Sequence, residues 1–220
     1  MPRAESRLDW DQYLDEIVQS WRRDSERKQE RSIRREKEIL SAALRVFARD
    51  GISRSKIGDI AAEAGMSTST LYEYFPSKED IAQVVPISHW AQFYEEYADA
   101  ARKLQTCHER LYTFLWLNAD FARRNDEWAR VFYLEIWPSV AIADSELRAN
   151  IDDFARVVIA LLKEGKATGE FKKFENPYEA SAILIGSVSQ IITTWLLYRR
   201  PKNLSKAAES MLANIIGRIL

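Results

Sequence analysis

A row of hydroxyl-bearing residues follows a glycine in the first third of the chain. After Gly65 come four hydroxyl amino acids in succession and then two tyrosines, all within ten residues. Such hydroxyls both donate and accept hydrogen bonds, which suits contacts with phosphate oxygens and with base edges in a DNA major groove. The hydroxyl residues expected to contact DNA are Ser67, Thr68, Ser69, Thr70, Tyr72 and Tyr74.

Two short helices joined by a tight turn are expected to present these hydroxyls. Residues 57–64 are expected to form the first helix, with small apolar positions that permit close packing, and Gly65 can take a left-handed turn. In the second expected helix, 68–75, Leu71 and Phe75 are four residues apart and anchor one face inward. The pattern predicts a helix-turn-helix.

The remaining sequence is typical of an all-α protein. Hydrophobic residues make up 46% and charged residues 30%, with only 7 glycines and 6 prolines, and no alternating strand pattern is present. Apolar positions recur at helical spacing from an amphipathic segment at 8–21 to the last helix. We expect an N-terminal extension at 1–30, a helix-turn-helix DNA-binding domain at 31–80 and an effector-binding and dimerisation domain at 81–220.

Positive charge is concentrated near the N-terminus. Residues 22–56 hold 12 lysines and arginines against 6 acids, although the whole chain has a net charge of −1. Such an excess favours an anionic partner, although a solvated helix face gives the same pattern. Two roles are open for the N-terminal extension: it contributes to DNA binding, or its residues 8–21 dock on the body or on a partner subunit. Measuring DNA binding after deletion of residues 1–30 distinguishes these roles. Expected nonspecific phosphate contacts are Arg22, Arg23, Arg27, Lys28, Arg31, Arg34 and Arg35.

Residues 39–81 resemble the DNA-binding region of the TetR/AcrR regulators. The resemblance rests on matches at fixed offsets, which are Leu40, Ala43, Phe47, Gly51, Ile57, Ile60, Ala61, Ala64, Gly65, Ser67, Thr70, Leu71, Tyr72, Phe75, Ser77, Lys78 and Glu79. It implies a three-helix DNA-binding head joined to a helical ligand-binding and dimerisation body. Family members mostly repress transcription, and a small molecule in the body releases them from a palindromic operator.

The resemblance also implies roles for particular positions. Residues 68–70 and Tyr72 should face the groove, Tyr72 and Tyr74 should lie near phosphates, and Lys78 should contact the DNA backbone. Ser55 and Lys56 match the pair that opens the second helix, where Lys56 replaces a threonine. Ser69 replaces a common glycine and Glu73 a frequent aromatic or neutral residue, so the base sequence that is read stays open.

Two long apolar helices near the C-terminus are expected to form the dimer interface. Residues 180–198 carry no charge, and this stretch is long enough to span a membrane. Six hydroxyl and amide side chains within the stretch instead favour burial by protein. In the family, such a helix pair forms a four-helix interface with its two-fold mate. The expected interface residues are Phe154, Val158, Leu161, Ile185, Val188, Ile192 and Trp195.

The middle helices are rich in aromatic residues, which could line an apolar cavity. For any single residue, plain core packing is the alternative. The expected pocket residues are Trp90, Phe93, Tyr94, Tyr97, Phe114, Asn118, Phe121, Trp128, Phe132 and Glu135. The segment 164–171 with the late tryptophan helix resembles family members that sense fatty acyl groups, so the expected effector is small and largely apolar.

Few residues suit catalysis. His89 and His108 are the only histidines, and neighbouring Cys107 and His108 project about 100° apart on a helix. We find no phosphate loop and no metal-ligand spacing, and therefore expect no enzyme activity, cofactor or metal. The single cysteine and the acidic, non-signal N-terminus suit the cytoplasm. A helical adaptor that binds protein through 8–21 remains the alternative function.

Overall fold

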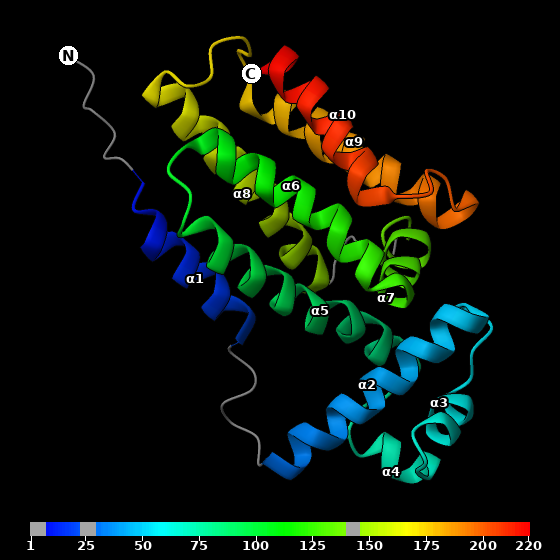
Figure 1. Cartoon of the computed structure of the whole chain (residues 1–220). Helices are drawn as coiled ribbons and strands as arrows, with labels where there is room; N and C mark the ends of the chain where they lie inside the picture. Colours follow the sequence, from blue (N-terminus) through cyan, green and yellow to red (C-terminus); the bar gives the residue numbers. More distant parts are fainter. Residues whose placement is uncertain (1–7, 23–29, 140–145) are drawn as a thin grey trace.

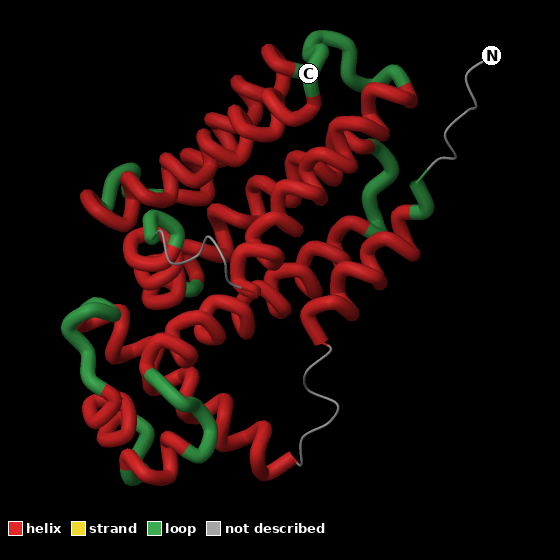
Figure 2. Tube along the Cα trace, turned by 180° about the vertical axis from the view of Figure 1, so that it is seen from behind, coloured by secondary structure: helices red, strands yellow, loops and turns green. Residues whose placement is uncertain are grey.

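The computed structural model describes residues 8–22, 30–139 and 146–220, and in these parts it contains helices and loops but no strand (Figures 1 and 2). The predicted all-α class is confirmed. The helices are α1 (Trp10–Arg22), α2 (Glu30–Asp50), α3 (Ile57–Glu63), α4 (Thr68–Tyr72), α5 (Lys78–Ala101), α6 (Cys107–Arg124), α7 (Asp126–Arg130), the π-helix η1 (Val131–Ile136), α8 (Glu146–Thr168), α9 (Pro177–Tyr198) and α10 (Leu204–Ile219).

Helices α2, α3 and α4 form a small head at one end of the molecule (Figure 1). The apolar stripe of α2 is buried, with Ile39 and Val46 fully inaccessible, and the helix ends at Asp50 as its sequence predicts. Gly51 follows with φ 82° and Gly65 closes α3 with φ 65°, so both glycines occupy the left-handed region that favours glycine. The head therefore has the predicted helix-turn-helix.

One continuous helix joins the head to the body. The Ser77 hydroxyl accepts from the backbone N–H of Asp80 and so caps α5, which then runs from the head into the bundle (Figure 1). The expected domain boundary at 80/81 falls within the first turn of this helix. Helix α2 also contacts α7 and η1 of the body. The head and the body are therefore connected both by α5 and by the contacts of α2.

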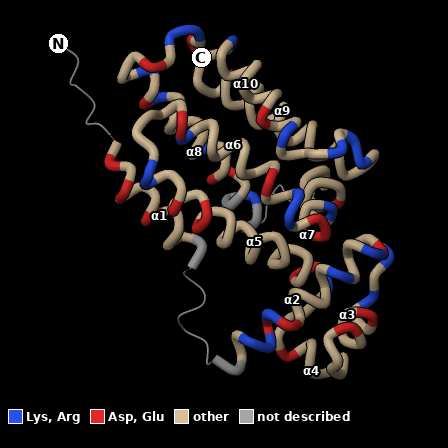
Figure 3. The backbone as a smooth tube through the Cα atoms, in the orientation of Figure 1, with Lys and Arg blue, Asp and Glu red and all other residues tan. Residues whose placement is uncertain are grey.

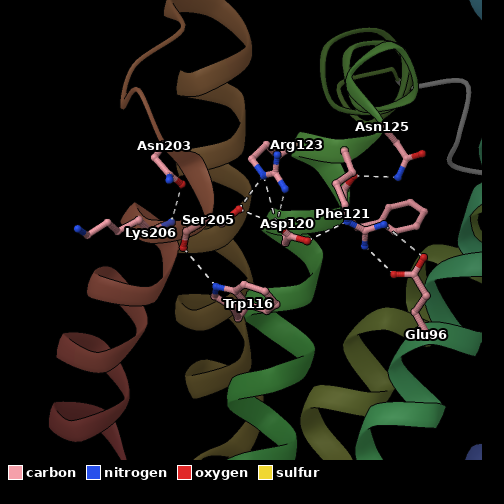
Figure 4. A network of polar contacts seen from close by, with 10 residues as sticks. Glu96, Trp116, Asp120, Phe121, Arg123, Asn125, Asn203, Ser205 and Lys206 are labelled. Carbon is pink, nitrogen blue, oxygen red and sulfur yellow. Dashed lines mark hydrogen bonds and ion pairs between the residues drawn. The ribbon is translucent and has the colours of Figure 1, made fainter.

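A polar cluster ties three helices of the body together (Figure 4). Asp120 of α6 accepts hydrogen bonds from Ser205 on α10 at 2.7 Å and from Arg123 and Arg124. Arg124 continues to Glu96 of α5 at 2.6 Å. Burial opposes ionisation of Asp120, but these donors prevail and hold the pKa of its carboxyl below its usual value.

The N-terminal helix α1 packs on the body of its own chain. It lies along α5 (Figure 1), with Leu14 buried and the Arg110 guanidinium 5.4 Å above the Trp10 ring. Asp15 pairs with Arg102, the residue that follows α5. Burial, followed by the charge of Asp153 on α8, raises the pKa of Tyr13 to about 12. Docking on the body, one of the two predicted roles of 8–21, is therefore confirmed.

The expected interface residues of α8 and α9 require a correction. Val158, Leu161, Val188 and Ile192 are at most 1% exposed, because they pack into the protomer's own core. Their side chains therefore have no surface to offer a partner. Trp195 is half-buried beneath the Arg199 guanidinium. Large apolar side chains are instead exposed on the opposite side of α9, at Ile183 and Leu197.

Candidate DNA interface and ligand cavity

Helix α4 presents an exposed polar face beside two buried anchors. Leu71 and Phe75 are buried as predicted, which turns Thr68, Ser69 and Tyr72 toward solvent. Tyr72 is 52% exposed, an unusual state for a large ring. This surface can place its hydroxyl groups and one aromatic ring against a DNA groove.

Several hydroxyls of the predicted contact set are already used within the helix. Ser67 is the N-cap of α4, and its Oγ accepts from the Thr70 N–H at 3.1 Å and lies 2.7 Å from Ser69 Oγ. Thr70 and Tyr74 are half-buried. Helix α4 ends at Tyr72 rather than at residue 75, because Pro76 disfavours helical backbone before it and the last bonds tighten to the i−3 carbonyl.

Two residues of the predicted contact set hold the head together instead. Ser55 is 4% exposed, and its Oγ donates to the Gly51 carbonyl at 2.6 Å, which corrects its assignment as a DNA contact. Lys78 Nζ donates to the carbonyls of Ile52 and Ser55 at 2.7 and 2.9 Å. The lysine thus clamps the α2–α3 loop to the start of α5. Lys56, in contrast, is exposed at the start of α3.

Replacing Lys78 by methionine is expected to lower the free energy of unfolding by about 1.5–3 kcal/mol, since two loop carbonyls lose a charged donor. The salt dependence of DNA binding should not change. Lys56→Met is the matched control, with unchanged stability and a salt slope reduced by roughly 0.9 for each phosphate lost. Urea unfolding and salt titrations measure both effects. A salt slope that falls in Lys78→Met would restore the phosphate role.

Asp and Glu residues lie among the Lys and Arg residues of the head (Figure 3), and several of the described arginines pair with them. Arg34 and Arg35 both bond Glu38 on the same helix, at 3.1 and 2.9 Å. Arg45 of α2 pairs with Glu63 of α3 at 2.7 Å. The other five expected phosphate contacts of 22–35 lie outside the described side chains. Lys56 is exposed at the start of α3 and takes part in none of these ion pairs, so its ammonium is available to phosphate.

A cavity of about 110 Å³ lies inside the body where five helices meet. Its wall comes from α5, α6, η1, α8 and α9 and is mostly aromatic and aliphatic. The lining residues are Trp90, Asn118, Phe132, Tyr133, Trp137, Ile151, Asp152, Phe154, Ala155, Ile185 and Ser189. Trp137 and Asp152 are exposed, so this side of the cavity reaches solvent.

The cavity uses three of the ten predicted pocket residues, namely Trp90, Asn118 and Phe132. Six others form the aromatic layer behind its wall, each at most 1% exposed, and these are Phe93, Tyr94, Tyr97, Phe114, Phe121 and Trp128. Phe154 and Ile185, expected at the dimer interface, line the cavity instead. Sequence reasoning missed these because spacing marks an apolar face without saying what that face meets.

Glu135 lies at the head rather than in the pocket, which corrects its assignment. It is exposed, and its Oε1 would lie 3.3 Å from a Cβ added to Gly51 in the turn after α2. The π-helical bond from Trp137 N–H to the Phe132 carbonyl, 2.8 Å, turns successive side chains of η1 to different sides. Phe132 and Tyr133 consequently line the cavity while Glu135 meets the head.

Two polar groups in the cavity wall lack partners among the described residues. Trp90 is 4% and Asn118 2% exposed, yet the Trp90 Nε1 and Asn118 Nδ2 donors have no acceptor. Asn118 Oδ1 accepts from the Tyr133 hydroxyl at 2.9 Å. Burial raises the pKa of Tyr133 far above its usual value, so this hydroxyl stays neutral. Most buried donors in folded proteins are paired.

Comparison with protein families agrees with this division into head and body. The description "Bacterial regulatory proteins, tetR family" matches residues 39–85, and "YsiA-like protein, C-terminal region" matches residues 88–218. The chain belongs to the TetR family. Its members are DNA-binding transcriptional regulators, and this chain is one of them. Helix α1 lies outside the residues that these two descriptions match.

Two of the similar proteins are matched over nearly their whole length, and a third only over about a quarter of its own length. The Fatty acid metabolism regulator protein of Bacillus subtilis is 26% identical over 186 residues, which is 83% of this chain and 94% of that protein. The crystal structure of FadR from Bacillus subtilis with stearoyl-CoA has a TM-score of 0.72 and 26% identity, covering 81% of this chain and 96% of that one. LuxR of Vibrio harveyi is 42% identical over 53 residues, 24% of this chain and 26% of LuxR.

Proposed function

We propose that the chain is a cytoplasmic repressor that binds a palindromic operator as a homodimer and leaves it when an acyl ligand enters the body. The exposed face of α4 and the Lys56 side chain contact DNA. The adaptor alternative loses its basis because the apolar face of α1 is covered by the chain's own α5. Relatives are transcriptional regulators rather than enzymes.

The position of η1 carries the proposal for release. One side of this π-helix lines the cavity through Phe132 and Tyr133, and the other places Glu135 against the turn at Gly51. The cavity of about 110 Å³ is smaller than an engineered 150 Å³ cavity that holds benzene. A long acyl chain therefore has to displace the wall, and a close-packed interior transmits that displacement to the head.

The outward face of α9 is proposed to join two protomers. Among the described helices, α9 is the one long and apolar enough to cross a membrane. Ile183 and Leu197 are more than half exposed, and Gly186 between them permits close approach of a second helix. Family members act as dimers, and a two-fold partner placed here covers the apolar face.

The test is release of labelled operator DNA, recovered by selection from random sequence, upon titration with stearoyl-CoA. We expect anisotropy to fall to that of free DNA, with free CoA as the inactive control. Ala155→Phe, which fills the cavity, should bind DNA normally but need at least about tenfold more ligand, since added volume in a packed site costs about 1–3 kcal/mol. Equal responses to stearoyl-CoA and free CoA would rule out the acyl effector.

A further inference from the structure

We propose that Trp90 Nε1 and Asn118 Nδ2 form a carbonyl-binding pair that determines which ligands the cavity accepts. Both donors belong to the wall of one cavity, one from α5 and one from α6, and both lack an acceptor among the described residues. The ligand class is therefore an apolar molecule with an oxygen acceptor, such as a thioester, ester or ketone. The expectation that the ligand is an acyl compound rests on the proposed function. The expectation that it carries an oxygen acceptor does not.

The Tyr133 hydroxyl fixes which end of the amide faces the ligand. It donates a hydrogen bond to Asn118 Oδ1 at 2.9 Å, so the amide oxygen already has a partner. The NH₂ group has none among the described residues. The Tyr133 ring is held by Phe132 at 5.0 Å and Trp128 at 6.3 Å, so the hydroxyl has little freedom to turn away. Tyr133 is therefore a positioning residue for Asn118.

The Trp90 indole is fixed even more firmly. Its ring packs edge-on against Phe93, Trp128 and Phe132 with centroids 5.2–5.3 Å apart. The indole therefore cannot swing out to water to satisfy its N–H. A ligand oxygen that accepts from both donors is that of a carbonyl rather than a hydroxyl, because a hydroxyl proton would have to find its own acceptor.

The first experiment uses small probes and does not depend on the acyl proposal. Cyclopentanone and methylenecyclopentane have the same shape, but only the ketone accepts hydrogen bonds. In ¹⁵N-labelled protein we expect cyclopentanone to shift both the Trp90 indole and the Asn118 amide signals downfield, and methylenecyclopentane to shift neither in that direction. Trp90→Phe and Asn118→Leu assign the two signals. Identical shifts with both probes would show that Trp90 and Asn118 do not bind a carbonyl oxygen.

The second experiment compares stearoyl-CoA with S-octadecyl-CoA, a thioether that lacks the carbonyl. We expect the thioester to release operator DNA at a roughly 10- to 100-fold lower concentration, because the thioether leaves buried donors unpaired. Trp90→Phe and Asn118→Leu should each reduce that ratio toward one. Tyr133→Phe keeps the Asn118 side chain but removes the bond that orients its amide, so we expect a ratio between that of the wild type and one.

The outcomes separate the two proposals. Shifts with the ketone but no DNA release by either CoA derivative would support the pair and overturn the acyl effector. Release by both derivatives at equal concentration, with no ketone-specific shift, would support the acyl effector and overturn the pair.

Discussion

Replacing Tyr72 by alanine is expected to weaken operator binding by about 30-fold to 1,000-fold. The ring is 52% exposed on α4, about 100° around the helix from the buried Leu71, where it can reach the groove wall. A hydrogen bond to a phosphate or base contributes about 1–2 kcal/mol, and a two-fold dimer loses it in both half-sites. Anisotropy titrations of labelled operator measure the loss at fixed salt.

Tyr72→Phe is the matched variant for this prediction, since it removes only the hydroxyl. We expect it to lie between the wild type and Tyr72→Ala, and both variants should melt at the wild-type temperature because the side chain stabilises little in the free protein. Nonspecific DNA binding should fall less than operator binding. Unaltered operator affinity in Tyr72→Ala would place the reading surface elsewhere on the head.

Replacing Trp128 by alanine is expected to reduce the free energy of unfolding by about 3–5 kcal/mol, a large share of the total for a domain of ordinary stability. The ring is 1% exposed and stacks on Phe132 with centroids 5.4 Å apart. It also packs edge-on against Trp90 and Phe121. Urea unfolding followed by circular dichroism gives the change.

Trp128→Phe separates packing from hydrogen bonding in the same position. The indole Nε1 donates to the Pro86 carbonyl of α5 at 3.3 Å, so this variant leaves a buried carbonyl unpaired while keeping an aromatic ring. We expect it to lose about 1–3 kcal/mol, less than alanine. A loss below about 1 kcal/mol in Trp128→Ala would mean that the aromatic layer is not closely packed.

Local signals predicted the head well. Gly51 and Gly65 mark the ends of α2 and α3, because few other residues adopt positive φ. The spacing of Leu71 and Phe75 alone identifies the inward side of α4. The clamp by Lys78 was not predictable in this way. Its carbonyl partners lie 23 and 26 residues earlier, and only the folded loop brings them to its ammonium.

The cavity was less predictable for a related reason. An aromatic stripe shows that a helix face is buried, but the rotation of five helices decides which rings line the space and which pack behind it. Phe114 and Phe154 illustrate this, with centroids 4.5 Å apart but only Phe154 in the cavity wall. In the same way, the spacing of Val188 and Ile192 could not distinguish burial by a partner from burial within the protomer.

Helix α1, together with the segment that connects it to α2, limits how far the head can move away from the body. It is fixed to α5 by Leu14, and eight Cα steps connect its last residue, Arg22, to the first residue of α2, Glu30. Eight steps reach at most about 29 Å, so the near end of α2 can move only within that radius of its anchor. A wider swing must peel α1 from the body and expose Leu14 to water. In the proposed release mechanism, the extension thereby limits how far the head can move relative to the body.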